Sequence, residues 1–274
     1  MNKSIGFVGA GSIAEALIRG LLSAPLVKPE QIAVCNRSNT ARLQELEKRY
    51  DVRIIRDKDR LVRVSDVLVL ATKPKDSAHA LAEIGRLSLQ GRVVISVVAG
   101  VRTDSVERLL GEGVQVVRAM PNTSCHVRES ATAISSGRSA GEQALQLAVE
   151  LFSCVGKVSL VPEEMLDPVT GLSGSGPAYV YLLMEAMIEG GVQQGLPPGV
   201  SRDLAVQTVL GAAKMAAETG EDPELLRHRV TSPGGTTLAG LQVLAERGFN
   251  SAVTQAISRA TARSRELGRG LLDS

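Results

Sequence analysis

Residues 5–14 read IGFVGAGSIA, an apolar run followed at once by a glycine-rich turn. Gly9, Gly11 and Ala14 have the spacing G-x-G-x-x-A, and a helical pattern continues to residue 22. In such a unit the first glycine permits a tight turn, the second lets the backbone approach a pyrophosphate, and the last small residue lets helix and strand pack closely. A turn that binds nothing is the alternative, but strand, turn and helix in this order favour a dinucleotide site. The cofactor contacts predicted in this loop are Gly9, Ala10, Gly11, Ser12 and Ile13.

Short apolar runs rich in Val and Ile alternate with helical patterns as far as residue 161. The runs lie at residues 5–8, 32–35, 67–71, 93–98, 114–117, 131–135 and 158–161. Helical patterns lie between them at residues 13–22, 40–49, 77–87, 104–110 and 140–152. Because the runs do not alternate with polar residues, the strands should be buried on both faces, as in a parallel sheet covered by crossover helices. The pattern predicts an α/β fold in which residues 1–161 form a doubly wound Rossmann sheet.

After Pro162 the strand pattern ends, and helical stretches punctuated by glycine and proline follow. Residues 162–274 are therefore predicted to form an all-α domain. Between residues 178 and 188 the only charged residue is Glu185, and a helix that is apolar nearly all round must be buried. A helical domain this small needs a second subunit to cover such a surface, so we expect a homodimer through the C-terminal helices.

The composition is that of an ordinary globular protein. The 274 residues are 44% apolar and 22% charged, with a net charge of +2. Basic and acidic residues are mixed along the chain and aromatic residues make up only 2%, so neither a nucleic-acid surface nor a membrane surface is expected. No apolar run approaches the length of a membrane span.

Neither a zinc spacing nor a disulfide framework is present among the cysteines, which are Cys35, Cys125 and Cys154. The histidines are equally scattered, so no metal site is expected; they are His79, His126 and His228. Unpaired thiols favour a reducing, cytoplasmic compartment. Cys125 and His126 are neighbours, but a nucleophile and its base usually meet through the fold. An unreactive thiol and imidazole in a loop is the favoured interpretation.

The end of the second apolar run indicates which dinucleotide is bound. NAD enzymes usually place a carboxylate there to hold the ribose hydroxyls. Here the run continues into Asn36, Arg37 and Ser38, with no carboxylate. An arginine and a hydroxyl suit a 2′-phosphate, so these three residues are predicted to bind NADPH in preference to NADH, although NADH stays possible. The alternative is a polar turn that starts the next helix.

Three further loops follow strands of the predicted sheet. In an open α/β sheet, ligands bind outside the carboxyl ends of the strands. The loops at residues 96–100 and 120–123 are small or polar, as is the one after the run at 67–71. Together they should line the cofactor cleft, with contacts from Ala71, Thr72, Lys73, Pro74 and Ala99.

Two glycine-rich segments lie in the C-terminal part. Residues 171–179 read GLSGSGPAY and residues 230–237 read VTSPGGTT, and a helical pattern follows each. Successive glycine amides at a helix start can bind a carboxylate without any basic side chain. Helix capping is the alternative, because Ser, Thr and Gly are common first residues of helices. For residues 230–237, the sequence alone favours neither anion binding nor helix capping.

With these segments in place, the chain resembles the pyrroline-5-carboxylate reductase family essentially from end to end. Residues 230–241, VTSPGGTTLAGL, correspond to the most specific motif of that family. The segments at 171–179, 194–196, 120–123 and 9–14 match in the same order. The resemblance implies a Rossmann domain followed by a helical dimerisation and substrate domain. Some members assemble as pentamers of dimers, that is, homodecamers.

The resemblance also implies a reaction and its residues. A hydride passes from C4 of NADPH to ring C5 of L-Δ1-pyrroline-5-carboxylate, and the nitrogen takes a proton, which gives L-proline in the last step of its biosynthesis. Ser232, Gly234 and Gly235 would hold the substrate carboxylate, and Thr237 would bond to the ring nitrogen as the catalytic residue. Thr236 and Glu163 fall at further ligand-contact positions. A protonated imine already accepts hydride well, so orientation and exclusion of water can suffice.

Some positions depart from the family pattern. Relatives often have an adenine-side Asn where this chain reads Asp57-Lys58-Asp59. Ser124-Cys125 stands where a Pro-Ala pair is usual, and His228-Arg229 where some relatives have Asp and Asn.

Two alternatives are a β-hydroxyacid dehydrogenase and a non-catalytic dinucleotide-binding paralogue. The first usually needs a lysine on a glycine-containing helix, and no such pattern lies between residues 171 and 194. An eroded substrate loop would favour the second, whereas residues 232–237 are intact here.

Overall fold

The computed structural model describes residues 2–269, which form two compact units. One unit comprises the residues up to Ser175 together with those from Ile257 onward, and the other is Gly176–Ala256. The division predicted between residues 161 and 162 lies earlier in the chain than this boundary. The difference has a packing cause, because the residues just after Pro162 stay with the sheet and Leu166 is fully buried there.

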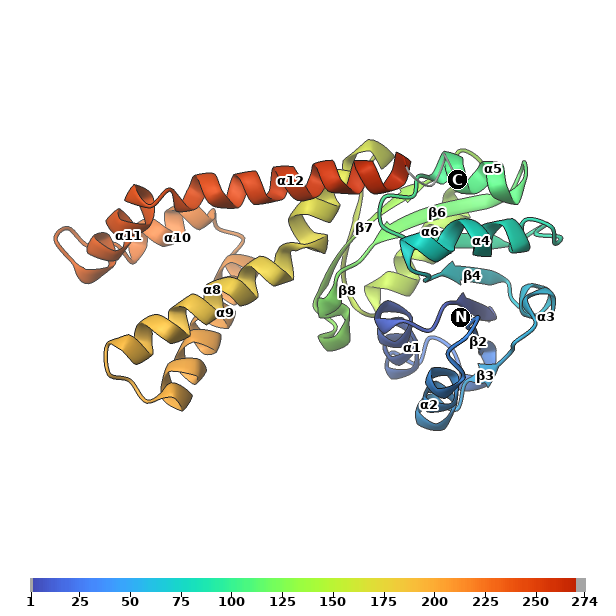
Figure 1. The fold of residues 1–274 in the computed structure, drawn as a ribbon, viewed down its shortest axis with the longest axis horizontal. Helices are drawn as coiled ribbons and strands as arrows, with labels where there is room; N and C mark the ends of the chain where they lie inside the picture. The colour runs from blue at the N-terminus through green and yellow to red at the C-terminus, as the bar shows by residue number, and fades with distance from the viewer. Residues whose placement is uncertain (1, 270–274) are drawn as a thin grey trace. The chain divides into compact units, whose positions relative to one another are not determined.

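An eight-stranded sheet forms the centre of the first unit, with strand order β3-β2-β1-β4-β5-β6-β7-β8 (Figure 1). The strands are β1 (Ile5–Val8), β2 (Ile32–Cys35), β3 (Arg53–Ile54), β4 (Val67–Leu70), β5 (Val93–Ser96), β6 (Gln115–Met120), β7 (Ser130–Ser136) and β8 (Gly156–Leu160). From β1 the chain winds outward through β2 and β3, then returns to β4 on the other side of β1. This reversal is the switch point at which doubly wound folds bind ligands. The predicted α/β fold with a Rossmann sheet is confirmed.

Both faces of the sheet are covered by helices, as the continuous apolar strands predict. Along β1, Ile5 and Phe7 belong to one core and Val8 to the other, so alternate side chains enter opposite cores. One core is closed by α1 (Ser12–Ser23), α2 (Thr40–Tyr50) and α6 (Glu142–Ser153). The other is closed by α3 (Lys58–Arg63), α4 (Pro74–Ile84) and α5 (Thr103–Leu110).

Two features of this sheet differ from the sequence prediction. The short elements β3 and α3 were not predicted, because β3 has only two residues, neither of them buried, and α3 is mostly charged. In addition, β7 runs antiparallel to β6 while the other strand pairs are parallel. A short connection containing η2 (Thr123–Val127) joins β6 to β7, and a connection this short permits only an antiparallel neighbour.

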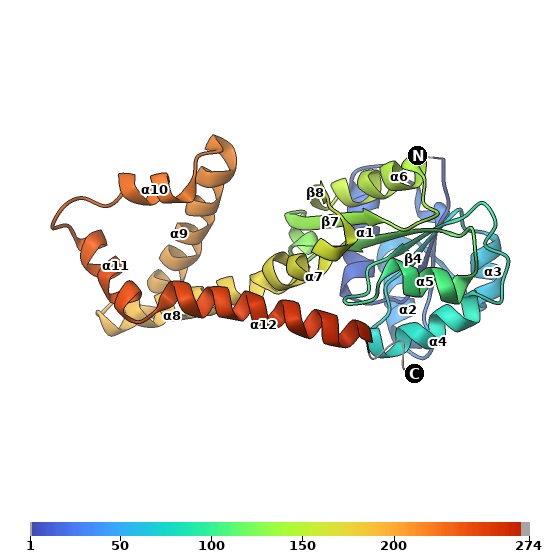
Figure 2. The ribbon, with the colours of Figure 1, turned by 90° about the horizontal axis from the view of Figure 1, so that it is seen from above.

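The second unit is helical. It contains α8 (Gly176–Gln193), α9 (Pro198–Thr219), α10 (Pro223–Arg229), α11 (Thr236–Glu246) and the start of α12 (Phe249–Arg269) (Figure 2). Helices α8 and α9 pack as a hairpin, in which the Ser201 hydroxyl donates to the Ile188 carbonyl at 2.8 Å. In a single chain no residue of α8 is buried, although the helix is almost wholly apolar. The surface that the sequence predicts to be covered is thus exposed within one subunit.

The glycine-rich segment 171–179 is helical rather than a loop before a helix. After η3 (Glu163–Met165), α7 (Leu166–Val169) leads into a π-helical turn, η4 (Thr170–Gly174), and the Ser175 amide donates to the Thr170 carbonyl at 2.9 Å. A side chain at Gly171 would meet the Ile257 carbonyl oxygen of α12 at 2.6 Å. At Gly171 the need for a glycine is therefore explained by close packing against α12.

Arg118 on β6 is the largest fully buried side chain of the described residues. Its guanidinium lies 3.5 Å from Glu163 and 3.4 Å from Asp167. The Ser264 hydroxyl of α12 donates to the same Asp167 oxygen at 2.7 Å. This buried arrangement ties η3, α7 and the end of α12 to the sheet.

Replacing Arg118 with Met should lower the free energy of unfolding by about 3–5 kcal/mol, because two partly buried carboxylates lose their cation. Arg108→Met on the exposed side of α5 is the matched control and should change it by no more than about 0.5 kcal/mol. Urea unfolding followed by circular dichroism measures both values. Equal stability of the two variants would contradict the role given to Arg118.

Candidate active site

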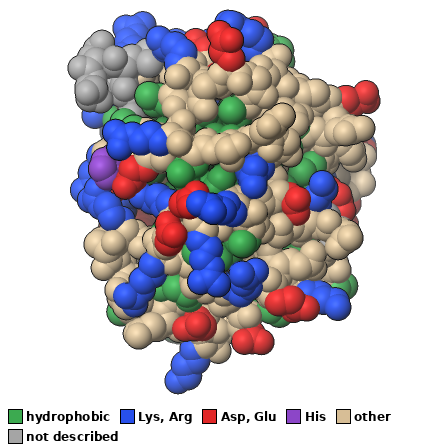
Figure 3. All heavy atoms as spheres, turned by 90° about the vertical axis from the view of Figure 1, so that its right-hand side faces the viewer, with side chains coloured by type: hydrophobic (Ala, Val, Ile, Leu, Met, Phe, Trp, Pro, Cys, Tyr) green, Lys and Arg blue, Asp and Glu red, His purple; other side chains and the backbone are tan. Residues whose placement is uncertain are grey.

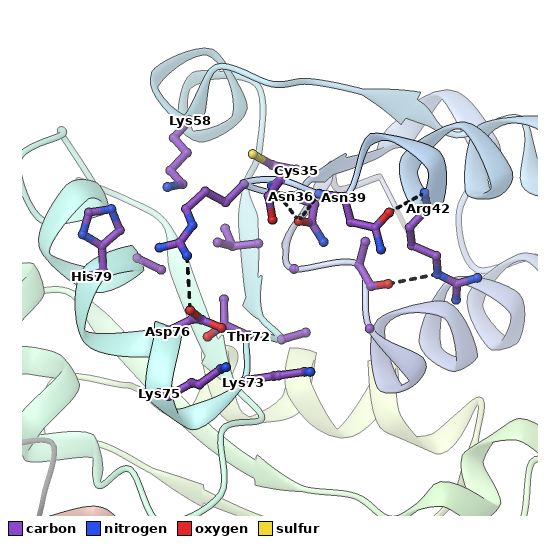
Figure 4. A pocket seen from close by; sticks show the side chains of 18 residues that line it. Cys35, Asn36, Asn39, Arg42, Lys58, Thr72, Lys73, Lys75, Asp76 and His79 are labelled. Atoms are coloured by element: carbon purple, nitrogen blue, oxygen red, sulfur yellow. Dashed lines mark hydrogen bonds and ion pairs between the residues drawn. The ribbon is translucent and has the colours of Figure 1, made fainter.

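A cleft of about 450 Å³ opens at the carboxyl ends of β1, β2 and β4 (Figure 4). It brings together many of the predicted cofactor residues, namely Gly9, Ala10, Gly11, Asn36, Arg37, Ser38, Ala71, Thr72 and Lys73. Ser12, Ile13, Pro74 and Ala99 do not line this cleft. Ser12 is the first residue of α1 and Pro74 the first of α4, so both still adjoin lining residues. Ala99 lies in the loop after β5.

The glycine-rich loop has the geometry that a pyrophosphate needs. Gly9 has φ +111°, and a side chain there would overlap the Ala71 carbonyl oxygen at the end of β4. Its amide donates to the Cys35 carbonyl at 2.8 Å, which joins the loop to β2 as well. Gly11 is different, because a Cβ there would have only the Ala71 oxygen near it, at 3.9 Å. The space beside Gly11 is therefore left free for a ligand.

The start of α1 is open to an anion. Its N-cap is Gly11, and no side chain caps the helix. The amides of the first turn have no acceptor within the helix. Together with the helix dipole, they suit a negatively charged group at this edge of the cleft.

Thr72 lines the cleft, and its hydroxyl is the only buried side-chain oxygen or nitrogen without a hydrogen-bond partner among residues 2–269. A buried hydroxyl left without a partner costs free energy. A bound ligand with a hydroxyl or phosphate oxygen would remove that cost. The donor set of the cleft thus fits a dinucleotide on evidence from the chain itself.

The turn after β2 combines the two interpretations that its sequence allowed. The Asn36 side chain accepts hydrogen bonds from the Ser38 and Asn39 amides at 3.2 and 3.3 Å, and Asn39 caps α2. These contacts are those of a polar turn before a helix. Arg37 instead lines the cleft, where its guanidinium lies 3.6 Å from the Asp76 carboxylate (Figure 4). Since both side chains are substantially exposed, this ion pair is weak and a phosphate can displace it.

The segment 230–237 forms a tight turn followed directly by α11. Pro233 and Gly234, with φ +69° at Gly234, occupy the centre of the turn, and the Gly235 amide donates to the Ser232 carbonyl at 3.0 Å. Gly235 is the N-cap of α11, and no side chain caps that helix. The first amides of α11, those of Thr236 and Thr237, therefore have no intrahelical acceptor. Capping, the alternative to anion binding, does not account for this helix start.

Glu163 is engaged by its own chain. Its two carboxylate oxygens accept hydrogen bonds from the Thr103 amide and the Thr103 hydroxyl, each at 2.6 Å. It therefore serves the start of α5 in the way an N-cap would, in addition to pairing with Arg118. The substrate contact that the resemblance implies for Glu163 stays a prediction.

Comparisons with known proteins identify the family of the chain. Residues 163–267 match a family model described as pyrroline-5-carboxylate reductase dimerisation, and residues 4–100 match one described as NADP oxidoreductase, coenzyme F420-dependent. Pyrroline-5-carboxylate reductase 1 of Bacillus subtilis (strain 168) is 44% identical over 270 residues, which are 98% of this chain and 91% of that protein. The chain belongs to the pyrroline-5-carboxylate reductase family.

Solved structures of the family have the same fold. The pyrroline-5-carboxylate reductase of Coxiella burnetii superimposes with a TM-score of 0.90 at 36% identity, over 97% of this chain and 99% of that one. The Plasmodium falciparum pyrroline carboxylate reductase, whose structure has NADP bound, gives 0.88 at 29% identity, over 97% and 98%.

Two basic residues of this family member reach the cleft although the sequence did not predict them there. Lys58 begins α3 and pairs with Glu83 of α4, and this hydrogen bond lowers the pKa of Glu83. Arg42 of α2 donates to the Ala10 carbonyl at 3.1 Å and pairs with Glu15 of α1, which holds the glycine-rich loop from outside. Figure 4 shows Lys58 and Arg42 on opposite sides of the cleft. Lys58 could have been found, because it occupies the segment that departs from the family's adenine-side Asn.

Charge around the cleft is mixed. Lys75 and His79 of α4 also line it, but Asp76 and Glu83 lie on the same helix. On the face of the molecule in Figure 3, basic and acidic side chains are likewise intermingled. The cations beside the cleft are therefore local partners for phosphate groups rather than parts of a continuous basic surface.

The thiols do not contribute to this chemistry. All three cysteines are buried, and burial raises the pKa of Cys125 and of Cys154 to about 11. These thiols stay protonated near neutral pH and are poor nucleophiles. Within residues 2–269, no group of three His, Cys, Asp or Glu side chains is placed to hold a metal ion. In the same range, no helix has the length and apolar character needed to cross a membrane.

Arg37→Ala should raise the KM for NADPH about ten- to a hundredfold, the range expected for losing a charged hydrogen bond to the 2′-phosphate. The KM for NADH, which has no such phosphate, should change by no more than about twofold. Arg60→Ala is the control, since it removes a positive charge from an exposed position outside the cleft. An equal rise of KM for both cofactors would contradict the assignment.

Proposed function

We propose that this chain reduces L-Δ1-pyrroline-5-carboxylate to L-proline with NADPH, the last step of proline biosynthesis. The observation that carries the proposal is the 44% identity to a pyrroline-5-carboxylate reductase over 98% of the chain. Two features of the chain support it, namely the uncapped helix start at residues 232–237 and the unpartnered Thr72 hydroxyl in the cleft.

NADPH, when bound, supplies the hydride that reduces the C=N bond at ring C5. The glycine-rich loop, residues 9–13, binds the pyrophosphate through the open start of α1. Asn36, Arg37 and Ser38 bind the ribose of NADPH that carries the 2′-phosphate. The loops at 71–74 and Ala99 position the remainder of the cofactor.

The turn before α11 binds the substrate in this proposal. The Ser232 hydroxyl and the amides at Gly234 and Gly235 hold the carboxylate, and Thr236 and Glu163 add further contacts. The Gly235 amide already donates within the turn, so it contributes through a bond shared between two acceptors. The Thr237 hydroxyl oxygen accepts a hydrogen bond from the protonated ring nitrogen and so fixes the orientation of the imine. Since the protonated imine accepts hydride without further activation, the chain needs no strong acid or nucleophile here.

Thr237→Ala should lower kcat/KM for pyrroline-5-carboxylate about ten- to a thousandfold, because a polar contact to the reacting group is lost. The loss of NADPH absorbance on adding pyrroline-5-carboxylate measures it, and Thr237→Ser is the matched variant that should retain most of the activity. Turnover of Thr237→Ala near the wild-type rate would exclude Thr237 from catalysis. No turnover by the wild-type chain with either NADPH or NADH would overturn the proposed function and would favour a non-catalytic paralogue.

The active form in this proposal is a homodimer formed through the C-terminal helices. Large apolar side chains are exposed along α8 and α9 in one chain, including Tyr181, Leu182, Leu204, Leu210 and Met215. The match of residues 163–267 to a dimerisation model supports the same interface. Association of five dimers into a decamer, and a cytoplasmic location, are further parts of the proposal.

Sedimentation equilibrium at micromolar concentration should give a dimer or a multiple of it. Leu182→Glu and Leu204→Glu together should shift the mass toward the monomer, because charges would enter the apolar contact. Arg108→Glu, on the sheet-containing unit, is the control for a charge change elsewhere. A wild-type chain that sediments as a monomer would contradict the dimer.

A further inference from the structure

His126 lies beside the start of α1, although it is far from it in sequence. Its Nε2 is 2.6 Å from the Ser12 hydroxyl, a side-chain contact that joins η2 to the start of α1. Ser12 is the first residue of α1 and follows the N-cap Gly11. The half-buried imidazole thus meets the hydroxyl of a residue that is predicted to contact the cofactor and that adjoins Gly11 of the cleft lining.

The segment that carries His126 is held firmly. The Asn122 side chain accepts a hydrogen bond from the Ser124 amide at 3.0 Å, and its amide group donates to the Ser173 carbonyl at 3.0 Å. Cys125 is buried, and the Arg128 guanidinium donates to the Cys154 carbonyl at 3.2 Å. An imidazole on such a segment has a defined position and can act on its neighbour without first being ordered.

A serine hydroxyl has one proton to donate and two positions at which it can accept, and it rotates freely when nothing directs it. A proton on His126 Nε2, donated to the Ser12 oxygen, fills one accepting position. The Ser12 proton is then directed away from the imidazole. At the open start of α1, the acceptor that suits it is an oxygen of a bound pyrophosphate.

We propose that His126 is a positioning residue for the cofactor, which acts through Ser12 to direct the serine hydroxyl at the pyrophosphate. The inference rests on the proposed contact between Ser12 and the cofactor, and it adds a residue from outside the glycine-rich loop. It also gives His126 a role that excludes pairing with the neighbouring Cys125, whose buried thiol is protonated.

The test measures the Kd of NADPH for the purified chain, from the change in NADPH fluorescence on binding. The chain contains no Trp, so protein fluorescence adds little background. Ser12→Ala and His126→Leu should each raise the Kd about five- to tenfold, and the double variant should raise it no further than Ser12→Ala alone. His126→Gln should restore binding to within about threefold of wild type, because the Gln amide nitrogen can reach the position of Nε2.

Further measurements separate positioning from a general structural role. The kcat at saturating NADPH should stay within about twofold of wild type in His126→Leu, since only cofactor binding is altered. Val127→Ala changes the exposed neighbour of His126 and should leave both Kd and Tm unchanged. Lower Tm in His126→Leu with a Kd that Gln fails to restore would overturn the proposal, as would additive effects of the two single variants.

The Kd measurements on the Ser12 and His126 variants can fail without contradicting the proposed reductase activity, which is tested separately by turnover of the wild-type chain. If Ser12→Ala binds NADPH as wild type does, both the Ser12 contact and the role of His126 are wrong, while turnover of pyrroline-5-carboxylate by the wild-type chain still supports the reductase activity. If Ser12→Ala weakens binding and His126→Leu does not, only the role of His126 is wrong.

Discussion

The close approach of Gly9 to the end of β4 is the constraint on which the cofactor cleft depends. At this glycine, φ is positive and a side chain would overlap the Ala71 carbonyl oxygen, while the amide bonds to Cys35 at the end of β2. Three strand ends therefore meet at one residue without room for a Cβ. That meeting point determines where α1 begins and places Thr72, next to Ala71, at the wall of the cleft.

The sequence predicted the strands of the sheet because each is buried on both faces and reads as a continuous apolar run. It did not predict β3 or α3, which are short and carry little apolar pattern. For the same reason it missed Lys58, which reaches the cleft from α3, and Arg42, which lies on a helix whose sequence reads as solvent-exposed. Side chains that enter a site from short or polar elements leave no periodic pattern, so periodicity alone does not reveal them; for Lys58 the remaining signal was its place in the segment that departs from the family's adenine-side Asn.

Glycine-rich stretches in this chain serve different ends, which the sequence alone cannot separate. Residues 9–11 and 232–235 open onto uncapped helix starts, whereas residues 171–174 form a π-helical turn that packs against α12. Whether a glycine serves packing or ligand binding depends on its surroundings. A neighbouring helix contacts it in the first case, and an uncapped helix start follows it in the second. Glu163 illustrates the same limit, because its carboxylate is held by Thr103 and Arg118, residues distant in sequence.

The helical unit differs from the sheet in how little of it is buried within one chain. Its residues are well ordered into helices, yet α8, α10 and α11 contain no buried residue within one chain. An almost wholly apolar helix such as α8 loses much of its stability when exposed to water, so part of the free energy that keeps it folded has to come from a surface outside the single chain. The turn that precedes α11 belongs to this unit. Its geometry therefore depends on the same association, and the substrate binding proposed for residues 232–237 should be coupled to assembly of the dimer in a way that cofactor binding at the sheet is not.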